Sequence, residues 1–231
     1  INECNIEPLD YGVINGLPFF CTCGMGFDAF ISMKFSEAGK RGPITYVENV
    51  LKEGLKYKPE MYEVTDETGA KSYKAFLIAC ANASQYGNDA YIAPQASLTD
   101  GLMDVTIMEP FTVLDVPSLS FQLFNKTIDQ NSRVKTMRAK KIKIHRVNDG
   151  VMHFDGDPLM AGKELEVEIV PAGLRVIASE KKKEKPENPN LLQVISNYFS
   201  GLHLKGEEMM AKRQSHLFEL NRTLLGKLSK K

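Results

Sequence analysis

The sequence lacks the features that would direct the chain into a membrane or onto a nucleic acid. Its 29 lysine and arginine residues equal its 29 aspartate and glutamate residues, so the formal net charge is zero and no global basic field attracts a nucleic acid. No apolar run approaches the roughly 18 residues that a helix needs to cross a bilayer. We therefore expect a cytoplasmic protein that binds no nucleic acid and that touches a membrane at most peripherally.

The start of the chain and its cysteines add further absences. The first residues include neither the basic and apolar segments of a signal peptide nor an initiator methionine, so we expect a piece of a longer protein. Cysteine is scarce, and the alternation Cys21-Thr22-Cys23 would put two thiols on one face of a strand. No neighbouring histidine or cysteine pair completes a metal site. Buried free thiols in a reducing compartment are expected for Cys4, Cys21, Cys23 and Cys80.

What the chain does contain is a long series of strand-like segments separated by turns, within 231 residues of ordinary globular composition. The pattern predicts a mainly β (α+β) fold, a β-sandwich with a few helices. Helices are expected at 29–35, 46–56 and 114–125, and hairpin turns at 66–69 and 148–150. The expected strands are 60–65, 73–81, 105–108, 140–147, 152–154, 164–170 and 174–178.

The composition changes after residue 179. Residues 180–190 contain no apolar side chain and two prolines, which indicates a solvated linker. Residues 191–231 carry apolar stripes at helical spacing, which predicts two amphipathic helices. We expect these helices to dock on the sandwich or on a second subunit, with a membrane surface as the alternative. The predicted domains are therefore a sandwich at 1–179, a linker at 180–190 and a helical hairpin at 191–231.

Two stretches carry candidate chemistry. The first is His153-Phe154-Asp155-Gly156-Asp157-Pro158. Its Asp-Gly pair is the commonest hairpin signal, yet the second acid puts a carboxylate on each side of a bend, where one could project into a cleft.

The second stretch lies near the middle of the chain. Small and polar residues follow Asn82 at the end of an apolar strand, as they do where a strand end lines a cleft. A proline-containing loop then closes on Asp100-Gly101, which is either a plain turn or a carboxylate and backbone oxygens for Mg²⁺.

Five motifs occur in a characteristic order over residues 10 to 178. They are Asn15-Gly16…Phe19, Gly24-Met25-Gly26-Phe27-Asp28-Ala29, Asn82…Tyr86-Gly87, Ala93-Pro94-Gln95-Ala96…Asp100-Gly101-Leu102-Met103-Asp104, and Asp155-Gly156-Asp157-Pro158. Together they resemble the C-terminal half of the diacylglycerol kinase catalytic family, which includes bacterial diacylglycerol kinases, YegS-like lipid kinases, sphingosine kinases and ceramide kinases. The Ala-Pro…Asp-Gly block is the most diagnostic of the five.

The resemblance implies an ATP-dependent lipid kinase of two domains. An N-terminal α/β domain would bind ATP and Mg²⁺ through a Gly-Gly-Asp-Gly-Thr loop, and a C-terminal β-sandwich would close over it. That loop does not occur in this sequence, so the chain is expected to be the acceptor-lipid domain, inactive alone. Its implied partners are the N-terminal lobe of the parent protein and a membrane lipid, and a homodimer through the C-terminal helices is a further expectation.

The same resemblance implies roles for individual residues. Asp157 stands where the family has the glutamate of Asp-Gly-Glu, taken as the base that accepts the proton of the lipid hydroxyl. Aspartate is one methylene shorter, so the turn or the lipid must shift slightly to bring the base within reach. Asp100 matches the carboxylate of a structural Mg²⁺ site to which the positions of Ser97 and Leu102 contribute backbone carbonyls. Three residues resemble positions of the nucleotide or phosphate cleft: Asp10, Lys40 and Asn82.

Two other functions remain open at this point. NAD kinases also pair a nucleotide lobe with a β-rich lobe, and they would need a polar pocket for a dinucleotide in place of an apolar lipid channel. A non-enzymatic module for lipid binding or dimerisation would show binding or self-association and no activity.

Overall fold

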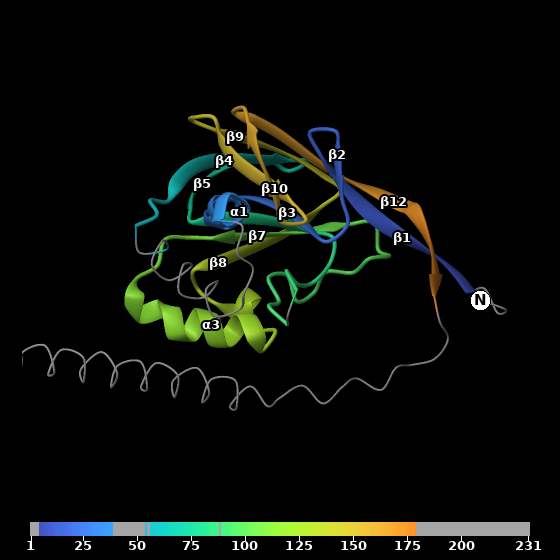
Figure 1. Ribbon diagram of the computed structural model, residues 1–231, viewed down its shortest axis with the longest axis horizontal. Coiled ribbons are helices and arrows are strands. Elements are labelled where there is room, and N and C mark those ends of the chain that lie inside the picture. Colours follow the sequence, from blue (N-terminus) through green and yellow to red (C-terminus); the bar gives the residue numbers. More distant parts are fainter. Residues whose placement is uncertain (1–4, 39–53, 55, 88, 179–231) are drawn as a thin grey trace, which may run out of the picture. The chain divides into compact units, whose positions relative to one another are not determined.

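The computed structural model describes residues 5–38, 54, 56–87 and 89–178. Within them, two six-stranded antiparallel sheets pack face to face (Figure 1), which confirms the predicted β-sandwich. The first sheet, sheet A, has the order β2-β1-β12-β9-β4-β5, and the second, sheet B, has the order β11-β10-β3-β6-β7-β8. The strands of sheet A are β1 (Asn5–Ile14), β2 (Leu17–Phe19), β4 (Glu60–Asp66), β5 (Gly69–Ala75), β9 (Lys141–Arg146) and β12 (Glu164–Ala178). Those of sheet B are β3 (Thr22–Gly26), β6 (Leu77–Ala81), β7 (Met103–Met108), β8 (Val134–Ala139), β10 (Gly150–Phe154) and β11 (Asp157–Ala161).

The main core lies between the two sheets. Strand β9 alternates charged and apolar residues, and its Ile142 and Ile144 point inward and are buried, as a half-exposed strand requires. Strand β7 is buried along its whole length because both faces of sheet B are covered. The inward-facing residues include Ile14, Met25, Ile78, Val105, Met152 and Val167.

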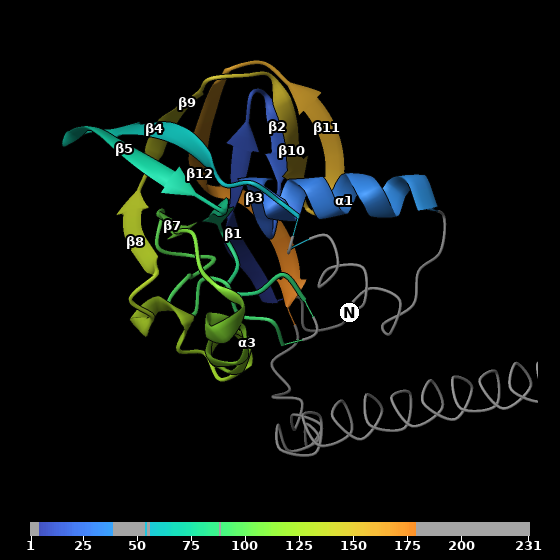
Figure 2. The same cartoon turned by 90° about the vertical axis from the view of Figure 1, so that its left-hand side faces the viewer.

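A second core covers the outer face of sheet B. Helix α1 (Phe27–Ala38) lies against β3, β10 and β11 (Figure 2). The rings of Phe27 and Tyr57 pack on Phe76, with centroids 4.5 and 5.5 Å away. Helix α3 (Val116–Phe124), flanked by the 3-10 turns η1 (Val113–Asp115) and η2 (Ile128–Gln130), buries Leu119 in the same cluster. The helix predicted at 114–125 is therefore confirmed.

Several local predictions need correction. The segment 73–81 is two strands in different sheets, because the chain passes from sheet A to sheet B at Phe76, whose N–H donates to the carbonyl of Met108. The turn at 148–150 is no hairpin, since β9 and β10 belong to different sheets. Segments 164–170 and 174–178 form the single strand β12. Cys21 precedes β3 and is exposed, whereas Cys23 is buried, so their thiols do not share one face of a strand.

The chain divides into two compact units, Ile1–Lys181 and Lys182–Lys231. The predicted linker and helical hairpin lie outside the described residues, as does nearly all of the helix predicted at 46–56. No helix in the described part of the chain is long and apolar enough to cross a membrane.

Candidate functional site

The antiparallel register gathers the predicted site segments at one end of sheet B. Thr22 at the start of β3 pairs with Ala81 at the end of β6, Ala81 pairs with Asp104 on β7, and Asp104 pairs with Arg138 on β8. On the other side of β3, Phe154 at the end of β10 pairs with Cys23. The acidic turn, the segment after Asn82 and the loop before Met103 therefore emerge together at this end.

Asp155 is a structural anchor of this end. Its carboxylate accepts hydrogen bonds from the backbone N–H groups of Phe20, Cys21 and Thr22, at 2.7, 2.8 and 3.0 Å. The backbone of Asp155 has φ 48° and that of Gly156 has φ 89°, the left-handed pair that a two-residue hairpin turn requires. Asp155 thus both shapes the β10–β11 turn and ties it to the β2–β3 connection.

Asp157 lies directly across this turn and has the opposite character. It is the first residue of β11, pairs with Phe154, and is exposed. No hydrogen bond or ion pair engages its carboxylate within the described residues. Because Asp155 fixes the turn, the carboxylate of Asp157 is held on a rigid hairpin while remaining open to an incoming group.

Asp10 and Asn82 brace the same end from inside. Asp10 is 4% exposed, and its carboxylate accepts from the N–H groups of Gly101 and Ala172, each at 2.7 Å, at an irregularity in the β1–β12 register. The side-chain amide of Asn82 donates to the carbonyls of Asp10 and Phe20. Its amide oxygen is buried with no partner among the described residues. The structure thus brings Asp10 and Asn82 together, whereas Lys40 lies outside the described residues.

The predicted magnesium loop contains one carboxylate, and that carboxylate is already engaged. One oxygen of Asp100 accepts from the N–H of Leu102 at 3.1 Å, and the other contacts the guanidinium of Arg138. The hydroxyl of Ser97 lies 3.4 Å from that of Thr99. No group of three or more His, Cys, Asp or Glu side chains in the described ranges could hold a metal ion. The carboxylate of Asp100 therefore already has a positively charged partner, the guanidinium of Arg138.

Arg138 and Asp104 were not predicted as site residues. Arg138 Nε lies 3.3 Å from Asp104 Oδ2. Burial raises the pKa of Asp104 despite the opposing attraction of Arg138, and the hydrogen bond to Asp100 raises the pKa of Arg138. Only the strand pairing of β7 with β8 joins these residues, so no local sequence pattern could reveal the contact.

A second polar cluster lies under the start of α1. His153 Nε2 is 3.1 Å from Asp28 Oδ2, and the hydroxyl of Tyr86 donates to the same oxygen at 3.0 Å. His153 is 3% exposed. Gly24 makes room for this cluster, since a Cβ there would lie 2.6 Å from Asp28 Oδ2. These residues link the loop after β6, helix α1 and the strand that leads to the acidic turn.

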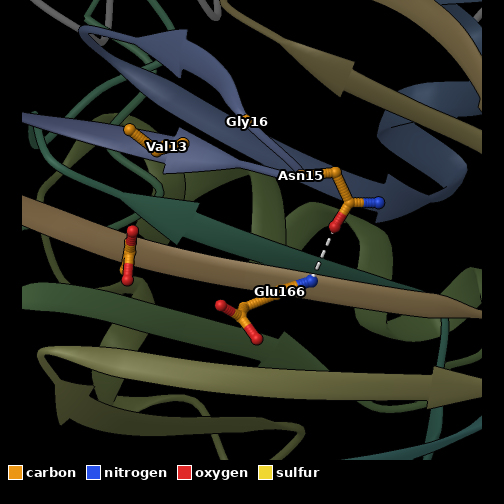
Figure 3. A pocket seen from close by; sticks show the side chains of 5 residues that line it. Val13, Asn15, Gly16 and Glu166 are labelled. Atoms are coloured by element: carbon orange, nitrogen blue, oxygen red, sulfur yellow. Dashed lines mark hydrogen bonds between the residues drawn. The ribbon is translucent and has the colours of Figure 1, made fainter.

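A shallow pocket of about 50 Å³ lies elsewhere, at the β1–β2 turn and β12 (Figure 3). Asn15 accepts a hydrogen bond there from the N–H of Glu166 at 2.8 Å. Lys141 pairs with the carboxylates of both Glu166 and Glu168. None of the predicted site residues lines this pocket, and its size suits a few water molecules rather than a lipid or a nucleotide. The candidate site therefore remains the end of sheet B.

Comparison with known proteins agrees with this architecture. A family model described as the YegS C-terminal NAD kinase beta sandwich-like domain matches residues 21–178. A probable lipid kinase YegS of Salmonella arizonae is 25% identical over 174 residues, covering 74% of this chain and 56% of the relative. Lipid kinase YegS of Escherichia coli K12 is 27% identical over 152 residues, covering 65% and 49%. The chain spans about half the length of these curated relatives.

Solved structures agree at the level of the fold. The crystal structure of a putative diacylglycerol kinase from Bacillus anthracis superposes with a TM-score of 0.57 and 15% identity, covering 76% of this chain and 57% of that one. A second diacylglycerol kinase structure from the same organism gives a TM-score of 0.55 and 14% identity, covering 76% and 55%.

Proposed function

Because the chain belongs to the family of YegS C-terminal, NAD kinase β-sandwich-like domains, we propose that it binds the acceptor lipid and supplies the catalytic base of an ATP-dependent lipid kinase. The names of its relatives, lipid kinase and diacylglycerol kinase, support a lipid hydroxyl as the acceptor, such as that of diacylglycerol or of a sphingoid-like lipid. The observation that carries the proposal is the exposed carboxylate of Asp157 on a hairpin that Asp155 fixes.

Phosphoryl transfer asks little covalent chemistry of a protein and depends on positioning and on a nucleophile that can lose its proton. In the proposed reaction, Asp157 accepts the proton of the lipid hydroxyl as the hydroxyl oxygen attacks the γ-phosphorus of ATP, whose bond to the β-phosphate oxygen breaks to release ADP. The braces at Asp10, Asn82 and Asp155 keep the turn and the neighbouring loops in register. ATP with Mg²⁺, when bound by a preceding lobe, supplies the phosphoryl group and neutralises its charge.

The proposed roles of the two lobes rest on the family description, which is of a C-terminal domain, and on the fact that the chain spans about half the length of its relatives. We propose residues 1–179 as the C-terminal lobe, 180–190 as a linker and 191–231 as two amphipathic helices that dock on the lobe or form a homodimer. The nucleotide-binding lobe would be the preceding part of the same parent protein. The whole protein would act in the cytoplasm, peripherally at the membrane that holds its substrate.

The test is a phosphoryl-transfer assay on the parent protein and on this chain alone. With labelled ATP and Mg²⁺, the parent protein should phosphorylate diacylglycerol or sphingosine in mixed micelles, and the isolated chain should transfer nothing. Activity of the isolated chain would contradict the proposed division between lobes.

A kinase acting on NAD is the second candidate, favoured by the NAD kinase-like sandwich that the family model describes. The same assay separates the two, because a lipid kinase saturates with lipid and ignores the dinucleotide. Phosphorylation of NAD but not of lipid would replace the first proposal by the second. Lipid binding or self-association without transfer in any arm would favour a non-enzymatic module.

A further inference from the structure

One guanidinium links two carboxylates at the end of sheet B that forms the candidate site. Arg138 on β8 lies directly opposite Asp104 on β7, and its Nε is 3.3 Å from Asp104 Oδ2. Its Nη2 contacts Asp100 Oδ2 in the loop before β7. The pairing of β7 with β8 therefore places the positive charge of Arg138 beside the loop for which the sequence predicted a metal ion.

We propose that the guanidinium of Arg138 takes the place of a divalent metal ion in the loop that contains Asp100, so that this loop adopts its structure without a metal. Both oxygens of Asp100 are engaged, one by the N–H of Leu102 and one by Arg138. Asp10 holds the same loop independently through the N–H of Gly101. The loop therefore has its hydrogen bonds and its counter-charge from within the chain.

The charges at this place explain why an arginine and a divalent cation exclude each other. Mg²⁺ requires oxygen ligands in near-octahedral arrangement and keeps several of its waters. A guanidinium bonded to the same carboxylate oxygens takes up one lone pair on each and repels a second cation at a few ångströms. The side chains of Arg138 and Asp100 are 45% and 31% exposed, so salt screens part of this repulsion.

Removing the guanidinium should therefore reveal a cation site. Without Arg138, the carboxylates of Asp100 and Asp104 lose their shared counter-charge, and each has an oxygen left without a partner. Two hard oxygen donors of this kind, with neighbouring backbone carbonyls and water, attract Mg²⁺ or Mn²⁺. A lysine keeps a positive charge at the position and should keep the metal out.

The experiment measures the melting temperature of the full 231-residue chain against Mg²⁺ and Mn²⁺, with EDTA as the reference. We expect no change for the wild type. Arg138→Gln should gain roughly 3–5 °C when the ion reaches about ten times its Kd, and the second change Asp100→Asn should remove that gain. Arg138→Lys and the control Arg175→Gln, which removes an exposed positive charge from β12, should behave as the wild type.

Two results would overturn the proposal. One is a rise in the wild-type melting temperature with Mg²⁺ that Asp100→Asn abolishes, because the loop would then hold a metal beside Arg138. The other is a folded Arg138→Gln chain, with wild-type circular dichroism, that gains nothing from either ion. Neither measurement involves phosphoryl transfer, so this inference stands or falls separately from the proposed function.

Discussion

Asp155 and Asp157 are separated by one glycine, and their surroundings give them different roles. Asp155 accepts three backbone hydrogen bonds, whereas Asp157 lies exposed with no partner in the described part of the chain. We predict that Asp155→Ala lowers the free energy of unfolding by about 2–3 kcal/mol, because three N–H donors lose a charged acceptor and water replaces it only in part. Asp157→Asn should change it by less than about 0.5 kcal/mol, as surface substitutions do.

Urea unfolding of both variants checks this contrast. The midpoint should fall for Asp155→Ala and stay in place for Asp157→Asn, with equal slopes. Equal midpoints would show that Asp155 does not anchor the turn.

At the residue scale, the sequence indicated which residues to examine but not their partners. The family resemblance singled out Asp10, Asn82, Asp100 and Asp157. The segments of Asn82, Asp100 and Asp157 lie at one end of sheet B, and Asp10, on β1 of sheet A, is hydrogen-bonded to Asn82 and Gly101 there. The bond from Ala172 to Asp10 spans 162 positions in the chain. Such a contact depends on which strands become neighbours, and neither a turn signal nor a local spacing contains that information.

Helix α1 can pack closely on β3 because Gly24, in the strand beneath it, has no side chain. A Cβ on Gly24 would lie 2.6 Å from Asp28 Oδ2 and 2.7 Å from the carbonyl oxygen of Ile78, and a backbone atom in the middle of a sheet cannot yield cheaply. We predict that Gly24→Ala lowers the free energy of unfolding by about 1–3 kcal/mol through overpacking.

Gly162→Ala is the matched control, since nothing lies within 4 Å of a Cβ there and its φ is not positive. It should leave the melting temperature unchanged or slightly raised. If thermal unfolding affected both variants equally, the close packing of α1 on β3 would not be what constrains Gly24.

The aromatic cluster under α1 predicts a loss of stability at alkaline pH. Burial raises the pKa of Tyr57 to about 12, whereas an unfolded tyrosine titrates near 10. Between about pH 10 and 12, the unfolded state loses the proton that the folded state keeps, so stability falls as the pH rises through this window. Urea midpoints measured from pH 9 to 12 should decline more steeply for the wild type than for Tyr57→Phe. The same slope in both would contradict the assignment.

At the element scale, the strands were easier to predict than their sheets. Alternation of apolar and polar residues located β4, β9 and β12. The same pattern cannot tell whether consecutive strands pair, so β9 and β10 were joined as a hairpin although they lie in different sheets. Strand β8 was not predicted. Of its four middle residues, Lys135 to Arg138, only Met137 is apolar, so the alternation of apolar and polar residues is weak there.

For the whole molecule, both described cores lie within the first compact unit. We predict that the chain without residues 180–231 still folds cooperatively and that its melting temperature falls by only about 2–4 °C, equivalent to about 1 kcal/mol for a chain of this size, which is the contribution of the proposed helices. A large drop would show that the deleted residues complete a core. The mass in solution of the two forms also tests the proposed homodimer, and a monomer both before and after deletion would reject it.

The central claim, that this sandwich supplies the base of a lipid kinase, is tested most directly by Asp157→Asn in the parent protein. With saturating ATP, Mg²⁺ and lipid, we predict that kcat falls by about 10²–10⁴, the usual contribution of a general base. The urea midpoint should match the wild type, and Glu67→Gln in the exposed β4–β5 turn should keep full turnover. Unchanged turnover in folded Asp157→Asn protein would contradict the claim.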